Sequence, residues 1–393
     1  MKDFCIMGSG MVGATLALGL VSQGHSVVLI EPHMPQSFSP EQPPDLRVSA
    51  LSVASVDLLK ALGAWEFIEQ TRMRAYRQLS VWEAENARTD FTAELVNLPE
   101  LGYFVENRLL QLGCLQALAN KSNFELITSS QVKSIDLSDK QAVNIELNDK
   151  QKVSAHWLIG ADGARSQVRK AARIACSGWQ YEQQALGIIV SMHEPQTDIT
   201  WQQFTPAGPR AYLPMYDNYA ALIWYDKADR VRQLAAMTPA QLKQPTIEAF
   251  PDLLGDFDVV FATGFPLTRS HASDYVKGNV VLIGDAAHTI NPLAGQGVNL
   301  GFRDIEALLA ITADADTSAH DALRSRLQKE YERPRRRDNL MMMSAMDGFY
   351  TLFSNDILPL KLARQSLLTL AQHLPFGKKQ VLKYALGLNE WKF

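Results

Sequence analysis

The first thirty residues alternate between apolar and glycine-rich segments in the order expected of a strand, a helix and a second strand. Residues 4–7 are all apolar, which is typical of a buried parallel strand. Apolar residues at helical spacing then extend from Met11 to Gln23. Gly24 follows where a helix often ends in the left-handed conformation. A second apolar run, from Ser26 to Ile30, completes a strand–helix–strand unit.

The pattern of the remaining chain changes twice. Residues 51–62 have helical spacing, and residues 157–161 form another short apolar strand before a basic helix. Between about 184 and 270, strand-like segments separated by turn residues predict an antiparallel sheet. A buried strand returns near 281–286, and helical patterns dominate from Gly297 onwards. We therefore predict an α/β protein in which a Rossmann-type domain is interrupted by a sheet domain and followed by helices.

We expect the chain to divide into three structural parts. The discontinuous nucleotide-binding domain comprises residues 1–75, 100–180 and 265–330. The inserted substrate-binding sheet domain comprises residues 76–99 and 181–264, and a helical region takes up 331–393. We interpret most aromatic residues on the predicted sheet as core, although alternate positions could wall an aromatic substrate. These residues are Trp201, Phe204, Tyr212, Trp224 and Tyr225.

Composition limits the function classes. A chain of 393 residues exceeds the size at which single cores stop growing, about 250–300 residues. With 38 basic and 42 acidic residues the net charge is −4, so no overall positive field would attract nucleic acid. The three cysteines form no CxxC pair, which fits a reducing compartment. Since no segment resembles a signal peptide or a membrane-spanning helix, we expect a cytoplasmic protein, with any contact to the inner membrane being peripheral.

A GxGxxG motif, formed by Gly8, Gly10 and Gly13, lies between the first strand and the first helix. Glycine at these positions permits a tight turn, close approach of backbone to a pyrophosphate, and close packing of helix on strand. The helix N-terminus then presents its positive dipole end to phosphates. Glu31 ends the next strand, where a carboxylate can bind both hydroxyls of an adenosine ribose and disfavours NADP. The motif predicts a dinucleotide site, leaving FAD and NAD open, with a purely structural glycine turn as the alternative.

A second motif favours a flavin. Asp285 ends the buried strand near 281–286, and the loop after it contains Gly295, Gly297 and Gly301. Glycines there would let a flat ligand lie against bare backbone, with the N-terminal amides of the next helix directed at it. A flavin needs a carboxylate for a ribityl hydroxyl and amides that stabilise its anionic reduced form. A simple helix cap is the alternative interpretation of Asp285.

Three motifs in the same order resemble the aromatic-hydroxylase class of FAD monooxygenases. They are GxGxxG, the string DGARS at 162–166 with Arg169, and Gly284-Asp285 followed after nine residues by Gly-Gln-Gly. In that class the DG motif lies near the flavin pyrophosphate and the pyridine nucleotide path. Outside these motifs, several segments are similar to the ubiquinone-biosynthesis hydroxylases, and the resemblance extends from Phe4 to Leu388. These segments are 47–55, 102–111, 201–214, 292–304 and 381–388.

The resemblance implies a set of FAD-binding residues. The set comprises Gly8, Gly10, Met11, Val12, Gly13, Glu31, Arg47, Arg108, Gln111, Asp162, Gly163, Asp285, Pro292, Gly295, Gln296, Gly297, Val298 and Asn299. Within it, Arg47, Arg108 and Gln111 should line the flavin. Pro292 and residues 295–299 should border the isoalloxazine ring.

No side-chain nucleophile is expected, because a flavin would carry the oxygen chemistry. His288 is the only histidine inside a motif, and we interpret it as a neutral side chain that fixes the loop. An acid or base role for His288 near the flavin is the alternative, and Pro292 is the other catalytic candidate. The family signature usually begins His-Pro, whereas this chain has Asn291, which cannot transfer protons near neutral pH. The other histidines have no ligand spacing, so no metal is expected.

The resemblance implies an enzyme that hydroxylates the ring of 2-polyprenyl-3-methyl-6-methoxy-1,4-benzoquinol in ubiquinone biosynthesis. NAD(P)H would reduce FAD transiently, O2 would form a C4a-hydroperoxide on the reduced flavin, and the quinol ring would attack its distal oxygen. Three alternatives stay open. They are a sister hydroxylase acting at another ring carbon, an FAD-dependent reductase or dehydrogenase, and a non-catalytic flavoprotein subunit of a ubiquinone-biosynthesis protein complex.

The C-terminal region contains two basic clusters. Residues 356–393 carry six basic and two acidic side chains among several leucines. A helix of this kind can lie on an anionic membrane surface. The alternative is a helix packed on its own domain with a solvated basic face. Upstream, the run of Arg333, Arg335, Arg336 and Arg337 predicts an exposed helix face rather than a nucleic-acid site.

Overall fold

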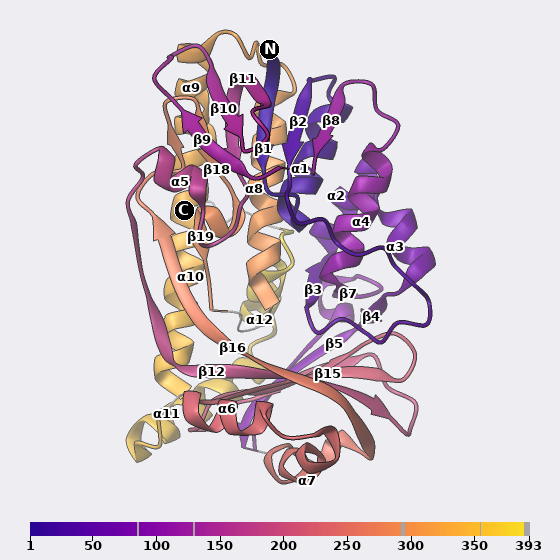
Figure 1. Cartoon of the computed structure of the whole chain (residues 1–393). Helices are drawn as coiled ribbons and strands as arrows, with labels where there is room; N and C mark the ends of the chain where they lie inside the picture. Colours follow the sequence, from indigo (N-terminus) through magenta and orange to yellow (C-terminus); the bar gives the residue numbers. More distant parts are fainter. Residues whose placement is uncertain (85, 129, 292–294, 354, 389–393) are drawn as a thin grey trace.

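The computed structural model describes residues 1–84, 86–128, 130–291, 295–353 and 355–388 (Figure 1). Its upper part in Figure 1 is a sheet with the order β17-β18-β11-β1-β2-β8, from which β10 and β9 continue beside β11. The strands from β18 to β8 are parallel. The bounds are β1 Lys2–Met7, β2 Val27–Ile30, β8 Phe124–Ile127, β9 Val132–Asp136, β10 Val143–Leu147, β11 Lys152–Gly160, β17 Val276–Lys277 and β18 Val280–Leu282.

A second sheet forms the lower part of the molecule in Figure 1. Its order is β19-β16-β12-β15-β14-β13-β5-β6, and its pairs are antiparallel except for β13 with β5. The bounds are β5 Gln78–Ala84, β6 Ala87–Thr92, β12 Cys176–Met192, β13 Ile199–Gln203, β14 Arg210–Pro214, β15 Tyr219–Lys227, β16 Phe257–Ala272 and β19 His288–Thr289. A small third sheet joins β3 Val48–Ser52, β7 Gly102–Glu106 and β4 Arg74–Tyr76.

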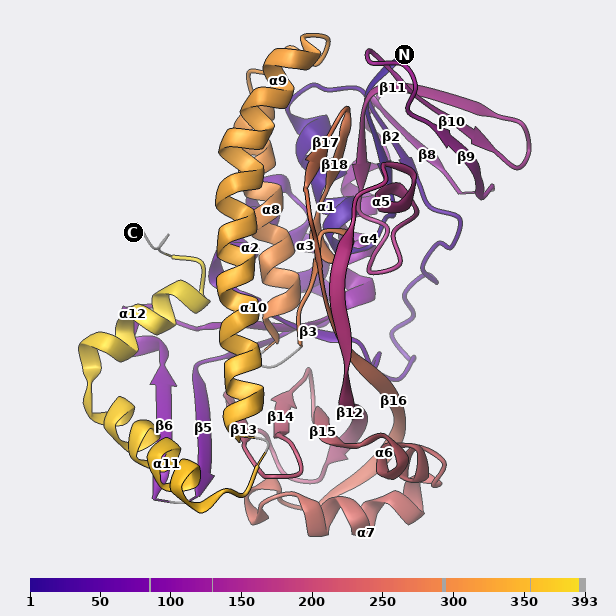
Figure 2. The same cartoon turned by 90° about the vertical axis from the view of Figure 1, so that its left-hand side faces the viewer.

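Helices cover both sheets. The bounds are α1 Met11–Ser22, α2 Val53–Leu62, α3 Trp65–Thr71, α4 Asn107–Leu118, α5 Gln167–Ala171, α6 Ala228–Ala235, α7 Pro239–Ala249, α8 Gln296–Thr312, α9 His320–Arg326, α10 Arg333–Phe353, α11 Leu358–His373 and α12 Pro375–Ala385. A π-helical segment, Leu327–Glu332, joins α9 to α10, so that one long helix runs down the side of the molecule (Figure 2). Within that segment, Tyr331 donates a hydrogen bond to the carbonyl of Leu282 at 2.6 Å.

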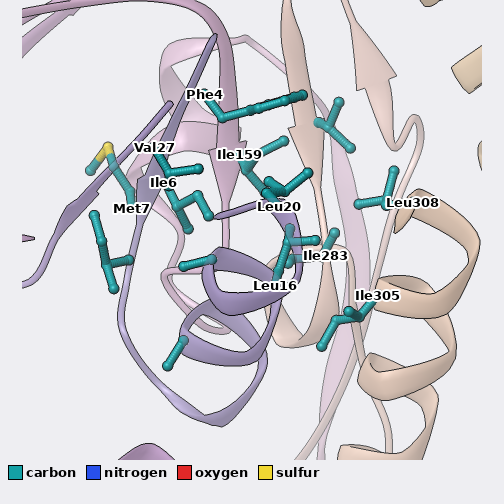
Figure 3. Close-up of a cluster of buried hydrophobic side chains, with 14 of the residues drawn as sticks. Phe4, Ile6, Met7, Leu16, Leu20, Val27, Ile159, Ile283, Ile305 and Leu308 are labelled. Carbon is teal, nitrogen blue, oxygen red and sulfur yellow. The ribbon is translucent and has the colours of Figure 1, made fainter. Parts of the chain in front are cut away.

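The main core lies between the parallel sheet and α1 and α8. Figure 3 shows Ile6 from β1, Leu16 from α1 and Ile305 from α8 converging on it. All three side chains are fully buried. The helix α1 can lie this close to α8 because Gly19 faces Leu309, where a Cβ would come within 2.5 Å of that side chain. The apolar runs that predict the opening strand–helix–strand unit are therefore the runs that form this core.

The structure corrects the expected helix at 51–62. Residues up to Ser52 belong to strand β3, which pairs with β7, and the helix begins at Val53. The Ser52 hydroxyl accepts a hydrogen bond from the backbone N–H of Ser55 and so caps the helix. The strand extends to Ser52 because its backbone pairs with Gly102, a long-range contact that local spacing does not reveal.

The expectation of an exposed arginine face at 333–337 is wrong for one residue. Arg333 and Arg337 are exposed, but Arg335 is buried and forms an ion pair with Asp304, with an Nε–Oδ1 distance of 2.9 Å. Four arginines within five consecutive residues of a helix cover more than one turn, so one of them must point toward the protein. The buried carboxylate of Asp304 compensates the charge of the buried Arg335.

The five aromatic residues expected on the second sheet are all buried. Trp201, Tyr212 and Trp224 pack in the core that α6 and α7 cover, whereas Tyr225 lies on the opposite face of the sheet. Two of the expected domain boundaries, 180/181 and 264/265, fall inside β12 and β16. Since these strands run on through both parts of the molecule, the division into domains stays a prediction. Among the described residues, no helix is both long and apolar enough to cross a membrane.

Candidate active site

The three glycines of the GxGxxG motif have different structural roles. Gly8 has a φ of +98°, and a Cβ at Gly13 would lie 1.9 Å from the carbonyl oxygen of Gly8. Both glycines are therefore required by the fold itself. Gly10 has an ordinary φ of −57°, is exposed, and a Cβ there would meet no atom within 4 Å. The space beside Gly10 is open at the N-terminus of α1, where a phosphate group would bind.

Two polar side chains hold the glycine loop. The carboxylate of Glu31 accepts a hydrogen bond from the backbone N–H of Ser9 at 2.9 Å. The amide of Gln111, on α4, donates to the Ser9 hydroxyl at 2.9 Å. Glu31 and Gln111 thus lie on either side of Ser9, at the carboxyl ends of the parallel strands. This edge is where open α/β sheets bind their ligands.

Asp285 lies on a short turn that follows β18. Its side chain is exposed, yet protein surrounds it on most sides, and this desolvation raises the pKa of its carboxyl. The electrostatic influence of two nearby side chains, His288 and Arg47, acts against that rise. An exposed carboxylate in such surroundings is poised to accept hydrogen bonds from a bound hydroxyl group.

The buried carboxylate of Asp304, on α8, fixes this turn. It accepts hydrogen bonds from the backbone N–H of Gly284 at 3.0 Å and faces the Nε2 of His288 at 2.6 Å. Its other oxygen pairs with Arg335. Burial alone would raise the pKa of Asp304, but the electrostatic influence and hydrogen bonds of His288 and Arg335 outweigh it and lower that pKa to about 2. The turn that carries Asp285 is therefore anchored to an ionised carboxylate.

Further contacts join the motifs to one another. Arg169 donates to the carbonyls of Ala164 and Ala286, both at 2.7 Å, and so ties the DG loop to the turn of Asp285. Asn299 is buried on α8; its amide bonds the carbonyl of Ala50 at 2.9 Å. Helix α8 also lies close to α1, because a Cβ at Gly301 would come within 2.6 Å of Val12. Segments far apart in the sequence thus meet around the first turns of α1 and α8.

The remaining predicted residues lie at the start of α8, at the start of α1, near Asp285, or outside the described residues. Gly295 is the N-cap of α8 with a φ of +63°, and Gln296, Gly297 and Val298 form its first turn. Met11 begins α1. Arg47 is exposed near Asp285, as described above. Pro292, the second catalytic candidate, lies outside the described residues.

Four predicted side chains are engaged within the protein. Arg108 forms two hydrogen bonds of 2.8 Å with the carboxylate of Asp45. Asp162 accepts from the backbone N–H groups that begin α5, and its neighbour Gly163 has a φ of +77°. The side chain of Asn299 fixes strand β3. His288 faces Asp304 rather than solvent, so its observed geometry is that of a residue that fixes the loop.

Sequence reasoning missed Asp304 and Arg335 as parts of the site. Asp304 lies within the segment 292–304 that carries the family resemblance, but nothing in its spacing indicates a partner 31 residues away on another helix. Ser9 was also missed, although its place between two motif glycines was a usable signal. Each of these residues acts on a motif through a tertiary contact.

Comparison with known proteins identifies the family. The model of the "FAD binding domain" family matches residues 1–339. The chain is 45% identical to the 3-demethoxyubiquinol 3-hydroxylase of Escherichia coli, over 98% of each chain. It is 34% identical to the ubiquinone hydroxylase UbiL of Rhodospirillum rubrum and 30% identical to the human mitochondrial ubiquinone biosynthesis monooxygenase COQ6, over 98% of this chain and 89% and 92% of theirs. This chain belongs to the FAD-dependent monooxygenase family of the ubiquinone-biosynthesis hydroxylases.

Solved structures agree on the fold. The p-nitrophenol 4-monooxygenase PnpA of Pseudomonas putida superposes with a TM-score of 0.79 over 100% of this chain and 99% of its own, at 19% identity. The protein PqsL of Pseudomonas aeruginosa superposes with a TM-score of 0.74 over 93% of this chain and 99% of its own, at 21% identity. These matches confirm the predicted α/β architecture of FAD-dependent aromatic hydroxylases. The family match confirms FAD as the cofactor.

The residues present fit FAD. The position of Gly10 is open for a pyrophosphate, and Glu31 lies beside it at the end of β2. Asp285 offers an exposed carboxylate beside the segment that leads into α8. The assignment of individual contacts to the cofactor stays a prediction, which the glycine loop allows us to test.

We predict that Gly10→Val will fold but will purify with less than a tenth of the FAD of the unmodified protein, because the side chain occupies the space next to the phosphates. Gly13→Ala is the matched comparison. It should lose about 3 kcal/mol of stability, because its Cβ would overlap the carbonyl of Gly8. Flavin absorbance and the thermal midpoint should be measured for both variants. A yellow Gly10→Val protein with normal occupancy would show that the cofactor is placed wrongly.

A second prediction concerns His271, which pairs with His288 between β16 and β19. Burial lowers the pKa of His271 to about 4. The unfolded chain takes up this proton near pH 6.5, so the stability of the folded protein should fall as the pH decreases from about 6.5 to about 4. His271→Gln cannot titrate and should show a shallower decrease in thermal midpoint over this window. Parallel pH profiles of the two proteins would exclude this role.

Proposed function

We propose that this chain hydroxylates the ring of 2-polyprenyl-3-methyl-6-methoxy-1,4-benzoquinol, with FAD, O2 and NAD(P)H. The observation that carries the proposal is the exposed Asp285 carboxylate on a turn fixed by Asp304, together with the open space at Gly10. The 45% identity to a relative named 3-demethoxyubiquinol 3-hydroxylase supports this choice of substrate. A sister hydroxylase acting at another ring carbon is the alternative.

The proposed reaction balances as a monooxygenation. One oxygen atom of O2 is inserted into a ring C–H bond, which becomes C–OH. The other oxygen atom leaves as water, formed with the hydride of NAD(P)H (two electrons and one hydrogen nucleus) and one proton from solvent. Bound FAD supplies the redox chemistry that activates O2.

The protein's own residues hold and shield the reactants. We assign Glu31 to the adenosine ribose, the backbone at Gly10 to the pyrophosphate, and Asp285 to the ribityl chain. The N-terminal turn of α8 would direct the positive end of its helix dipole at bound FAD and so favour negative charge there. No acid–base role falls to His288, because Asp304 already engages it.

A face of the second sheet provides the wall for the substrate ring. Tyr225 donates a hydrogen bond to Asn291 at 3.3 Å, just before the loop that leads into α8. Ile223 and Phe265 are partly buried beside Tyr225 on this face. We assign these two apolar side chains to contact with the ring and its prenyl chain, where they would exclude water. Asn291 itself is fully buried and fixes the loop to the sheet.

The test uses purified holoenzyme, NADH or NADPH, 18O2 and a short-prenyl analogue of the proposed quinol. We expect one 18O atom in the ring and one O2 consumed for each NAD(P)H oxidised. The fully oxygenated ubiquinol analogue is the control and should take up no label. The variant Asp285→Asn should need about 10–100-fold more FAD for half-maximal activity, because it loses a charged hydrogen bond.

Two results would contradict this proposal. Incorporation of label into an earlier phenol of the pathway, but not into this quinol, would assign the enzyme to the sister step. Oxidation of NAD(P)H with quantitative release of H2O2, whichever quinol is added, would exclude hydroxylation of these substrates altogether.

A further inference from the structure

Helix α11 has its polarity reversed relative to an ordinary surface helix. Among its described side chains, the buried one is Arg364, which is fully enclosed. Its outward positions are mainly leucines. Surface helices normally bury an apolar stripe and expose charges, so this arrangement calls for a partner on the outer side.

The inner contacts of α11 are polar. Arg364 pairs with Glu83 of β5, which is itself buried, and bonds the carbonyls of Leu352 and Asn355 at 3.1 and 2.9 Å. The hydroxyl of Thr89, on β6, donates to the carbonyl of Leu368 at 2.8 Å. Figure 2 shows α11 lying along β5 and β6 with α12 beside it. The helix is therefore anchored in one orientation, and its outer face is a fixed feature of the fold.

The outer side of α11 and the adjoining start of α12 carry many exposed apolar side chains. The exposed members are Leu358, Leu360, Leu362, Leu367, Leu370, Leu374 and Phe376, and we call them the leucine face. Phe376 is 76% exposed and Leu358 is 65% exposed. An open groove of about 510 Å³ between α11 and the β5–β6 hairpin includes Leu362 and Leu370.

Basic residues border the leucine face. Within residues 355–388, the lysines are Lys361, Lys378, Lys379 and Lys383, and the only acid is Asp356. Asp356 pairs with Lys361 at 3.2 Å. The three lysines of α12 therefore give this edge of the molecule a positive charge.

We propose that the leucine face lies on the surface of an anionic lipid bilayer, with the lysines of α12 at the headgroups. Exposed leucines and a phenylalanine next to lysines have the composition of an interfacial helix. This assignment rests on the proposed function in one respect, since a polyprenylated quinol would be dissolved in such a bilayer. The leucine face would bring the enzyme to its substrate.

A second copy of the chain fits this surface less well. In a two-fold dimer the same patch meets itself, so the lysines of α12 from both copies would lie in one interface. Like charges placed opposite one another oppose association. An anionic bilayer instead attracts the lysines, and its hydrocarbon region can bury the apolar side chains.

The experiment measures sedimentation of the holoenzyme with vesicles in the absence of quinol. The vesicles are phosphatidylglycerol–phosphatidylethanolamine mixtures or pure phosphatidylcholine. We expect binding to the anionic vesicles and weaker binding to phosphatidylcholine. Leu358→Gln/Leu362→Gln/Leu370→Gln should reduce binding at least tenfold. Lys378→Gln/Lys379→Gln should weaken anionic binding by roughly thirty-fold, which corresponds to about 1 kcal/mol for each lysine.

The matched control is Ile247→Gln/Leu253→Gln, which removes two exposed apolar side chains near α7 and should bind like the unmodified protein. All variants should hydroxylate a water-soluble short-prenyl quinol at the normal rate, so that a failure of membrane docking is separable from a failure of the proposed function. Absence of vesicle binding by the unmodified protein, or unchanged binding by the triple leucine variant, would overturn the proposal. The proposal would also be overturned if the unmodified protein formed a concentration-dependent dimer, did not bind vesicles, and lost the dimer in the triple leucine variant.

Discussion

The site depends on the contacts that the buried carboxylate of Asp304 makes. This carboxylate joins the turn of Asp285, the side chain of His288 and the long helix through Arg335. Removing one partner would leave a buried charge without compensation, which typically costs about 3–5 kcal/mol. The turn that carries Asp285 is therefore positioned by a buried ion pair, while the Asp285 carboxylate, which we assign to the cofactor, remains exposed.

Much of the fold could be predicted from the sequence because local patterns coincide with tertiary packing. The apolar runs of β1, α1 and β2 form the main core, and the glycines mark turns with positive φ or close contacts. Tertiary partners could not be predicted in this way. The end of β3 at Ser52 depends on pairing with Gly102, and the burial of Arg335 depends on Asp304. For the site, the motifs predict roles for Gly10 and Asp285, but they do not indicate Asp304 and Arg335, which act on the turn of Asp285 through tertiary contacts.

Two long strands of the second sheet extend toward the parallel sheet. Strands β12 and β16 pair along most of their length and reach from the edge of the parallel sheet into the lower part of the molecule (Figure 1). The Tyr225–Asn291 hydrogen bond joins the same two parts next to the loop before α8. Beyond this sheet, the inverted helix α11 anchors to β5 and β6 and directs its leucines outward. One continuous sheet thus connects the proposed ring-binding wall to the proposed lipid-facing surface.

The most direct test of the proposed function is mass spectrometry of quinone lipids from cells that lack this chain, complemented with the unmodified protein or with Asp285→Ala. We predict accumulation of the methylated, methoxylated benzoquinol that lacks one ring oxygen, with ubiquinone restored only by the unmodified protein. An unchanged ubiquinone profile in the cells that lack the chain would contradict the account. Restoration of ubiquinone by an Asp285→Ala protein without FAD would contradict the flavin mechanism itself.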